Sequence, residues 1–160
     1  MSRTVAVRFG GRWFWAYDVS LGVLLLEAVH VGLEMPPERL PRRAADVLED
    51  LRVHARLLAT IGFALDQKGW DTRERDFVQT LVAEAGRRFR ERGVITAADA
   101  SRRYLIDGEP FFLRGASQVD GAVVADLADA ILRLVRGELP PTPEPDRRWY
   151  LGLMDGPRQL

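Results

Sequence analysis

The chain of 160 residues contains no cysteine. This absence excludes disulfide bonds, thiolate ligands for a metal, and catalysis by a cysteine nucleophile. Histidine is scarce, since only His30 and His54 occur, and Lys68 is the single lysine among 23 basic residues. We attribute the preference for arginine to GC-rich codon usage, so the abundance of arginine is poor support for phosphate recognition.

The sequence also lacks a net charge and a long hydrophobic run. Its 23 basic residues balance 23 acidic ones, which argues against a general nucleic-acid-binding protein. The longest apolar run, residues 21–26, is too short to span a membrane, and the first residues do not resemble a signal peptide. We therefore expect a cytoplasmic protein with no membrane partner.

No sequence motif specifies a reaction or a cofactor. The chain has no glycine-rich nucleotide-binding loop, and Ser20, Ser101 and Ser117 lack the G-x-S-x-G context of a nucleophile elbow. No pair of carboxylates lies in an apolar setting that would separate their pKa values. We predict no catalytic residue, no metal site and no cofactor, and the missing motifs favour a non-catalytic protein.

The strongest structural signal is the segment TVAVRFGGRWFWAYD at residues 4–18. Two runs of alternating residues flank the Gly-Gly pair at 10–11, and glycine can adopt the positive φ that both positions of a two-residue hairpin turn require. This pattern predicts a β-hairpin in which Arg8 lies opposite Trp13. Side chains alternate between the two faces of a strand, so one face is apolar, with Val5, Val7, Phe9, Phe14 and Ala16.

The opposite face of this hairpin carries three large aromatic side chains. Monomers rarely expose large apolar patches, so a second layer of the same chain is the simpler explanation for this face. The alternative is a binding surface, because Trp, Tyr and Arg dominate the energetics of protein interfaces. Under either interpretation Arg8 is placed for a cation–π contact with Trp13. We define the aromatic hairpin face as Arg8, Trp13, Trp15 and Tyr17.

Apolar residues that recur every three or four positions predict four principal helices. The first is capped by Asp18 or Ser20, and Asp71 followed by Glu74 resembles the capping box of the third. A short additional helix is expected from Thr96 through Arg103. The four principal helices are expected from about Leu21 to Glu34, from about Pro41 to Leu65, from Asp71 to about Arg92, and from Asp120 to Gly137.

A second hairpin is expected around the Asp-Gly pair at 107–108, with strands at residues 104–106 and 111–113. Pro110 cannot donate to a strand ladder, so the later strand should lie at an edge. The predicted fold class is therefore α+β, with about four principal helices packed on a small antiparallel sheet built from two β-hairpins.

The sequence divides into three regions. Residues 1–137 are expected to form a single α+β domain, and residues 138–146 form a proline-rich, stiff connector. Residues 147–160 form an apolar tail that contains Trp149 and Tyr150. This tail either folds back over the aromatic hairpin face or docks on a second copy or another partner, as exchanged termini do.

Two groups of polar residues are candidates for chemistry. Glu27 and His30 have the E-x-x-H spacing of carboxylate-bridged metal sites. The further ligands are missing, and helical spacing places both with Glu34 on the polar side of their helix, so we interpret them as a solvated face. His54 follows Asp50 by one helical turn, as a general base oriented by a carboxylate would. The simpler interpretation is a boundary histidine satisfied by Asp50.

One part of the sequence concentrates positive charge. The arginines concerned lie on and just after the helix predicted from Asp71 to about Arg92. This helix also carries acidic residues, so we interpret the arginines as a second solvated face. A nucleic-acid surface would need more interleaved aromatic residues than Phe89 and Tyr104. The arginines are Arg87, Arg88, Arg90, Arg92, Arg102 and Arg103.

The sequence as a whole predicts a non-catalytic protein-interaction module, such as an adaptor, a regulator or an immunity-like protein. It would bind a protein partner or a second copy through the aromatic hairpin face, Trp149 and Tyr150. The alternative is a small-molecule-binding protein or small enzyme. Its pocket would lie between the hairpin and the helices and would use Tyr17, Asp18, Asp50 and His54.

Overall fold

The computed structural model describes residues 4–57, 62–66, 69–111, 113, 115–138 and 149–151, the last three by their backbone alone. These residues form an α+β fold, as the sequence predicts. The helices are α1 (Asp18–Glu34), α2 (Ala44–Leu57), α3 (Thr72–Arg92), α4 (Ala97–Arg103) and α5 (Gly121–Val135), with a short 3₁₀ helix η1 (Pro37–Arg39). The strands are β1 (Thr4–Phe9), β2 (Arg12–Tyr17), β3 (Phe63–Ala64), β4 (Val94–Thr96), β5 (Leu105–Ile106), β6 (Glu109–Pro110), β7 (Gln118–Asp120) and β8 (Trp149–Leu151).

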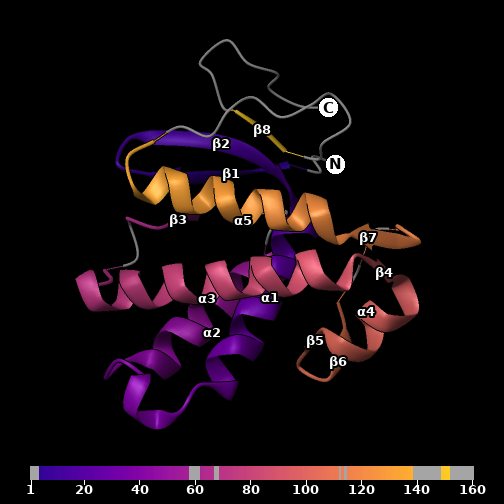
Figure 1. Ribbon diagram of the computed structural model, residues 1–160, viewed down its shortest axis with the longest axis horizontal. Helices are drawn as coiled ribbons and strands as arrows, with labels where there is room; N and C mark the ends of the chain where they lie inside the picture. Colours follow the sequence, from indigo (N-terminus) through magenta and orange to yellow (C-terminus); the bar gives the residue numbers. More distant parts are fainter. Residues whose placement is uncertain are drawn as a thin grey trace.

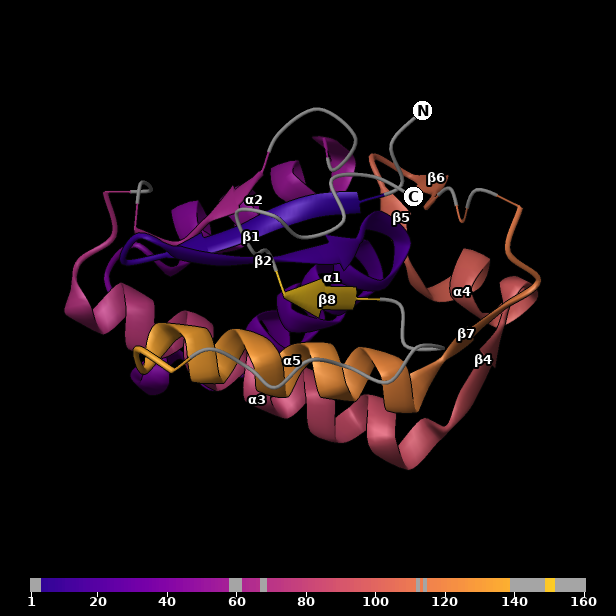
Figure 2. The same ribbon diagram turned by 90° about the horizontal axis from the view of Figure 1, so that it is seen from above.

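The largest of the described sheets has four strands in the order β3-β1-β2-β8. Figure 1 shows β1, β2 and β8 at the top and α2 at the bottom, with β3, α5 and α3 between them. α3 packs most extensively on α5, and α1 packs on both α2 and α3. Both views place α4 at one end of the molecule, together with the small sheets β4–β7 and β5–β6 (Figures 1 and 2).

The N-terminal hairpin has the register that the sequence predicts, with Arg8 opposite Trp13. Gly10 and Gly11 have φ values of 56° and 77°, which a two-residue hairpin turn requires and which glycine adopts without a steric cost. The turn is held to the rest of the fold, because the Gly10 amide donates to Asp66 at 2.8 Å. The predicted inner face is apolar and packs in the core: Val5, Val7, Phe14 and Ala16 are buried, and Phe9 is half-buried.

The second hairpin forms at the predicted Asp-Gly turn, where Asp107 has a φ of 54°. Its strands β5 and β6 make a separate sheet and do not join the first hairpin. β6 ends at Pro110, and Phe111 and Leu113 lie outside any strand. The first hairpin is extended instead by β3, parallel to β1, and by β8, antiparallel to β2. α4 immediately precedes β5, so the second hairpin lies with α4 at the end of the molecule (Figure 1).

The prediction of one helix from about Pro41 to Leu65 is wrong at its end. The described part of α2 reaches Leu57, and residues 63–64 form β3 beside β1. Phe63 and Leu65 are buried, with the half-buried Ala64 between them, which is the alternation of a strand. The Leu65 amide donates to the carbonyl of Arg8 at 3.0 Å. A distant strand therefore decides the conformation here, which helical spacing does not reveal.

The predicted caps of the later helices are confirmed. Asp71 and Glu74 form a reciprocal capping box at α3, with hydrogen bonds of 2.8 and 2.9 Å, and Asp120 accepts from the amide of Ala122 at the start of α5. The first helix differs from the prediction, because it already begins at Asp18 and its N-cap residue makes no side-chain cap. β2 thus continues into α1 without a loop, which fixes the sheet directly on the central helix.

Candidate functional site: the aromatic hairpin face

β2 separates its side chains into two environments. Phe14 and Ala16 are fully buried, whereas Trp13, Trp15 and Tyr17 are half-buried on the opposite face. This alternation follows from the geometry of a strand, in which neighbouring side chains point to opposite faces. The protein therefore keeps three aromatic residues of one strand partly accessible to solvent.

The strand β1 shows where the aromatic hairpin face is covered. On this face Thr4 and Ala6 are buried, with exposed fractions of 8% and 4%, whereas Arg8 is exposed. A second layer of the chain thus covers one part of the face. In the part nearer the hairpin turn, Arg8 is exposed and the opposite Trp13 is half-buried.

The two tryptophans form a defined unit on this face. Their ring centroids are 5.3 Å apart, and the ring planes meet at 84°. Such an edge-to-face pair contributes about 1 kcal/mol beyond the area that it buries. The pair therefore places two large aromatic rings in contact with each other on the aromatic hairpin face.

The predicted tail meets the hairpin at the edge of β2. The backbone of β8 pairs antiparallel with β2, so that Tyr150 lies opposite Trp15 and Trp149 lies opposite Ala16 (Figure 2). The side chains of Trp149 and Tyr150 are outside the described residues, as are 139–148 of the connector region and 152–160 of the tail.

The residues predicted to form the alternative small-molecule pocket contact different parts of the chain. Asp18 is buried at the start of α1, where it accepts from the Val19 amide at 2.7 Å. His54 is 5% exposed, and its Nδ1 lies 2.9 Å from the backbone carbonyl of Asp50. The Asp50 carboxylate accepts from the Trp70 indole at 3.2 Å. In this contact the backbone of Asp50 orients His54, not the carboxylate that a predicted general base would use.

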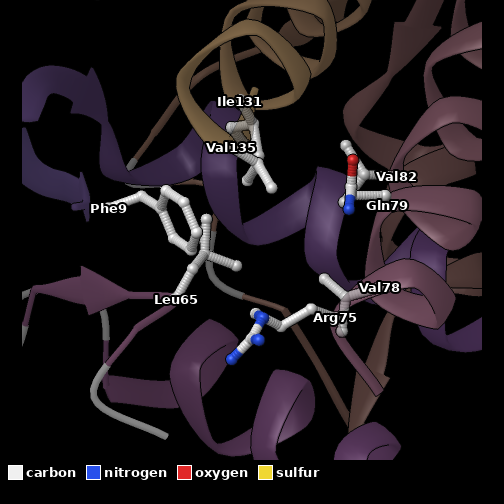
Figure 3. A pocket seen from close by; sticks show the side chains of 8 residues that line it. All are labelled: Phe9, Leu65, Arg75, Val78, Gln79, Val82, Ile131 and Val135. Carbon is white, nitrogen blue, oxygen red and sulfur yellow. The ribbon is translucent and has the colours of Figure 1, made fainter. Parts of the chain in front are cut away.

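A shallow hollow lies between the hairpin tip, α3 and α5, with about 250 Å³ of empty space that is partly open to solvent (Figure 3). The guanidinium of Arg75 donates to the backbone carbonyl of Trp70 at 2.8 Å. The hollow thus lacks the convergent polar groups that orient a ligand. Its lining does not include Tyr17, Asp18, Asp50 or His54; it consists of Phe9, Leu65, Arg75, Val78, Gln79, Val82, Ile131 and Val135.

A buried charge cluster is the feature that sequence reasoning missed. The interpretation of Glu27 as part of a solvated face is wrong, because its side chain is 0% exposed. Arg92 donates to its carboxylate at 2.7 and 3.0 Å, and Arg103 does so at 2.8 and 2.7 Å. The Tyr104 hydroxyl adds a hydrogen bond at 3.0 Å, and Arg88 lies 3.4 Å away. We call these five residues the Glu27 cluster.

The electrostatics of the Glu27 cluster keep the carboxylate ionised. Burial alone would raise the pKa of Glu27, but the hydrogen bonds from Arg103 and Arg92 outweigh it and hold this pKa well below its usual range. Burial raises the pKa of the Tyr104 hydroxyl, and the adjacent Glu27 charge raises it further. Breaking a buried ion pair by removing one partner costs several kcal/mol, so the cluster fastens α1, α3 and α4 together.

The prediction of a solvated face fits Glu34, whose side chain is 54% exposed, whereas His30 is half-buried. The Nε2 of His30 lies 3.0 Å from the carbonyl of Arg103, and Glu34 accepts from Arg88 at 2.6 Å. Among the described residues no group of three His, Asp or Glu side chains is placed to hold a metal. The sequence did contain a signal for the burial of Glu27. The helix around Glu27 is apolar on most of its circumference, and a helix that is apolar all round is buried.

Comparisons with known proteins do not assign the chain to a family. No family model, no curated protein and no solved structure matches it. In the part of the chain that the structure describes, no helix combines the length and the apolar character needed to cross a membrane.

Proposed function

We propose that this protein is a non-catalytic protein-interaction module that binds its partner through the aromatic hairpin face. One observation carries the proposal: Trp13, Trp15 and Tyr17 are only half-buried on a strand whose intervening residues are fully buried. Tryptophan, tyrosine and arginine are the residues that most often dominate binding energy at protein interfaces. A tryptophan pair beside an exposed arginine is a surface of this kind.

The surroundings of the other candidate residues support an interaction role over a catalytic one. The Nδ1 of His54 lies 2.9 Å from the backbone carbonyl of Asp50, and the hollow in Figure 3 does not include His54 in its lining. The buried carboxylate Glu27 is engaged by arginines that join helices. The aromatic hairpin face therefore offers the strongest basis for a function among the described residues.

The test compares the full chain with a double variant, Trp13→Ala with Trp15→Ala, purified gently from its own cells. Native mass spectrometry then reports subunit number, a retained protein and a retained small molecule. We expect the wild type to carry a protein partner or a second copy and the double variant to lose it. Circular dichroism should show the same helix content in both, because the two side chains are only half-buried.

A matched control removes apolar surface elsewhere. Leu33 and Leu105 are 63% and 45% exposed and lie outside the N-terminal hairpin, so their replacement by alanine should leave the association intact. Loss of the partner in both double variants would indicate a nonspecific hydrophobic contact and would contradict the proposal. A small molecule of constant mass on every chain would favour the small-molecule alternative instead.

A further inference from the structure

Two paired strands separate a small part of the chain from the helical core. β4 and β7 pair antiparallel, with Thr96 opposite Gln118, and the Gly121 amide donates to the carbonyl of Gly93 at 2.9 Å. Both strands pack on α5. The chain therefore leaves the core at the end of α3 and returns at the start of α5 through one firmly held base.

We define the lobe as α4 together with the hairpin β5–β6, residues 97–110. It lies at one end of the molecule (Figures 1 and 2). α4 packs mainly on β4 and on β6 of its own hairpin, and the Tyr104 amide donates to the carbonyl of Ala100 at 2.8 Å. The structure describes every residue of the lobe, and only Ala100 and Tyr104 are buried. The lobe therefore contributes little apolar surface to the core.

Two adjacent residues at the end of α4 fasten the lobe to the helical core. Arg103 donates to Glu27 at 2.8 and 2.7 Å, and its carbonyl lies 3.0 Å from the Nε2 of His30. Tyr104 donates to Glu27 at 3.0 Å and stacks on Phe89 of α3, with ring centroids 6.3 Å apart. These contacts join the lobe to both α1 and α3.

A further contact of the lobe with a helix lies at the surface. Arg56 on α2 forms an ion pair with Asp107 at the turn of the hairpin, and the exposed fractions of the two side chains are 43% and 68%. Surface ion pairs contribute little to stability, because water and salt screen the charges. The attachment of the lobe therefore depends mainly on Arg103 and Tyr104.

The lobe is too small to keep its structure once it is detached. α4 has seven residues, and isolated helices shorter than about 12–15 residues are marginal in water. β5 and β6 have two residues each, and a lone two-stranded hairpin is at best marginally stable. Loss of the contacts at Arg103 and Tyr104 therefore releases a segment that unfolds.

We propose that the lobe is a conformational switch, which undocks and unfolds as one unit while the four-stranded sheet, the other helices and the β4–β7 base stay folded. Proteins open in such cooperative units at a lower free energy than that of global unfolding. The transition of a segment between an ordered and a disordered form is one of the established types of switch.

Undocking changes what the protein presents at this end. It uncovers the carboxylate of Glu27, which is 0% exposed in the docked form, and the surfaces of α1 and α3 that Tyr104 contacts. A partner that binds only the docked or only the undocked form shifts the equilibrium between them. The inference is independent of the proposed function, because the lobe contains no residue of the aromatic hairpin face.

Native-state hydrogen exchange of the full wild-type chain, followed by NMR at increasing urea concentrations below the unfolding transition, tests the proposal. The hydrogen-bonded amides of the lobe, including that of Tyr104, should share one opening reaction. They should exchange at least about tenfold faster than the slowest amides of α3 and α5. Their exchange should also depend less on urea, because undocking exposes less surface than global unfolding. Lobe amides with the same rates and the same urea dependence as those of α3 and α5 would overturn the proposal.

A double variant tests which contacts hold the lobe. Arg103→Ala with Tyr104→Ala should give random-coil chemical shifts across residues 97–110 and leave the shifts of the sheet, α3 and α5 close to those of the wild type. Native shifts in the lobe of this variant would overturn the proposal. So would the loss of native shifts throughout the chain, because the lobe would then be an integral part of the core.

The matched control replaces two neighbouring side chains that point away from the core. Arg102 pairs with Asp99 inside the lobe, with 72% of its side chain exposed, and Leu105 is 45% exposed. Arg102→Ala with Leu105→Ala should keep native shifts in the lobe. A lobe that unfolds equally in both double variants would contradict a fastening at Arg103 and Tyr104.

Discussion

Arg103 donates two hydrogen bonds to Glu27 across 76 positions of the sequence, from Nε at 2.8 Å and from Nη2 at 2.7 Å. Glu27 is on the central helix α1, and Arg103 is the last residue of the short helix α4. Two parallel donors on one carboxylate fix orientation as well as distance. This ion pair determines how α4 and the following hairpin attach to the helical core.

We expect Glu27→Gln to lower the free energy of unfolding by about 3 kcal/mol, because it leaves the arginines of the Glu27 cluster without their buried counter-charge. Chemical denaturation at neutral pH measures the change. Glu84→Gln is the matched control: it also removes an Arg88 partner, but near the surface, where ion pairs contribute at most about 1 kcal/mol. Equal effects of the two substitutions would contradict the importance of burial.

The stabilising effect of Glu27 should depend on pH in a defined direction. Its pKa is lowered in the folded protein from an unperturbed value of 4.5, so in acid the unfolded chain binds a proton that the folded chain does not. The stability difference between wild type and Glu27→Gln should therefore be constant above about pH 5 and shrink as the pH falls below 4.5. Denaturation midpoints of both proteins from pH 7 to pH 3 measure this. A stability difference between the two proteins that grows in acid would contradict a lowered pKa of Glu27 in the folded protein.

Tyr104→Phe should cost about 1.5 kcal/mol of stability, because it removes one hydrogen bond to a buried charged group. The ring itself is kept, and its stacking on Phe89, with centroids 6.3 Å apart, should persist. An alkaline spectrophotometric titration adds a separate readout. One wild-type tyrosine should titrate above the usual range because burial raises the pKa of Tyr104, and this late step should be missing in Tyr104→Phe. An unchanged titration curve would place the late-titrating group elsewhere.

Gly121→Ala should destabilise the protein strongly, by about 3 kcal/mol. A Cβ at this position would overlap the backbone carbonyl oxygens of Phe89 and Gly93 at the end of α3, which cannot move independently. Gly32→Ala is the control, because its Cβ would meet only the flexible end of Leu48 and alanine favours the helix by about 1 kcal/mol. Thermal denaturation should rank Gly121→Ala far below Gly32→Ala; comparable midpoints would mean that α3 and α5 can separate at little cost.

The local parts of this fold could be predicted from the sequence. The alternation of residues 4–17 around two glycines determines both the hairpin and its register, and the observed pairing of Arg8 with Trp13 confirms it. The capping box of Asp71 and Glu74 is confirmed for the same reason. In each case the interacting residues are neighbours along the chain, so their types and spacing are sufficient.

The non-local parts could not be predicted in this way. Residues 63–64 belong to a strand because β1 offers them a pairing edge, and β4 pairs with β7 across a long stretch of chain. The surroundings of the aromatic hairpin face also depend on the whole fold. The sequence places Thr4, Ala6 and Arg8 on this face, but only packing decides that Thr4 and Ala6 are buried while Arg8 is open.

The amino-acid sequence by itself determined the hairpin, the later helix caps and the aromatic side chains that share one strand face, because local geometry fixes all three. Only the tertiary structure decided that Glu27 is a buried charge. Helical spacing places Glu27 with His30 and Glu34, but Arg92 and Arg103, which bind it, come from other helices. A charge can be buried once its counter-charges converge on it, and that convergence exists only when the chain has folded.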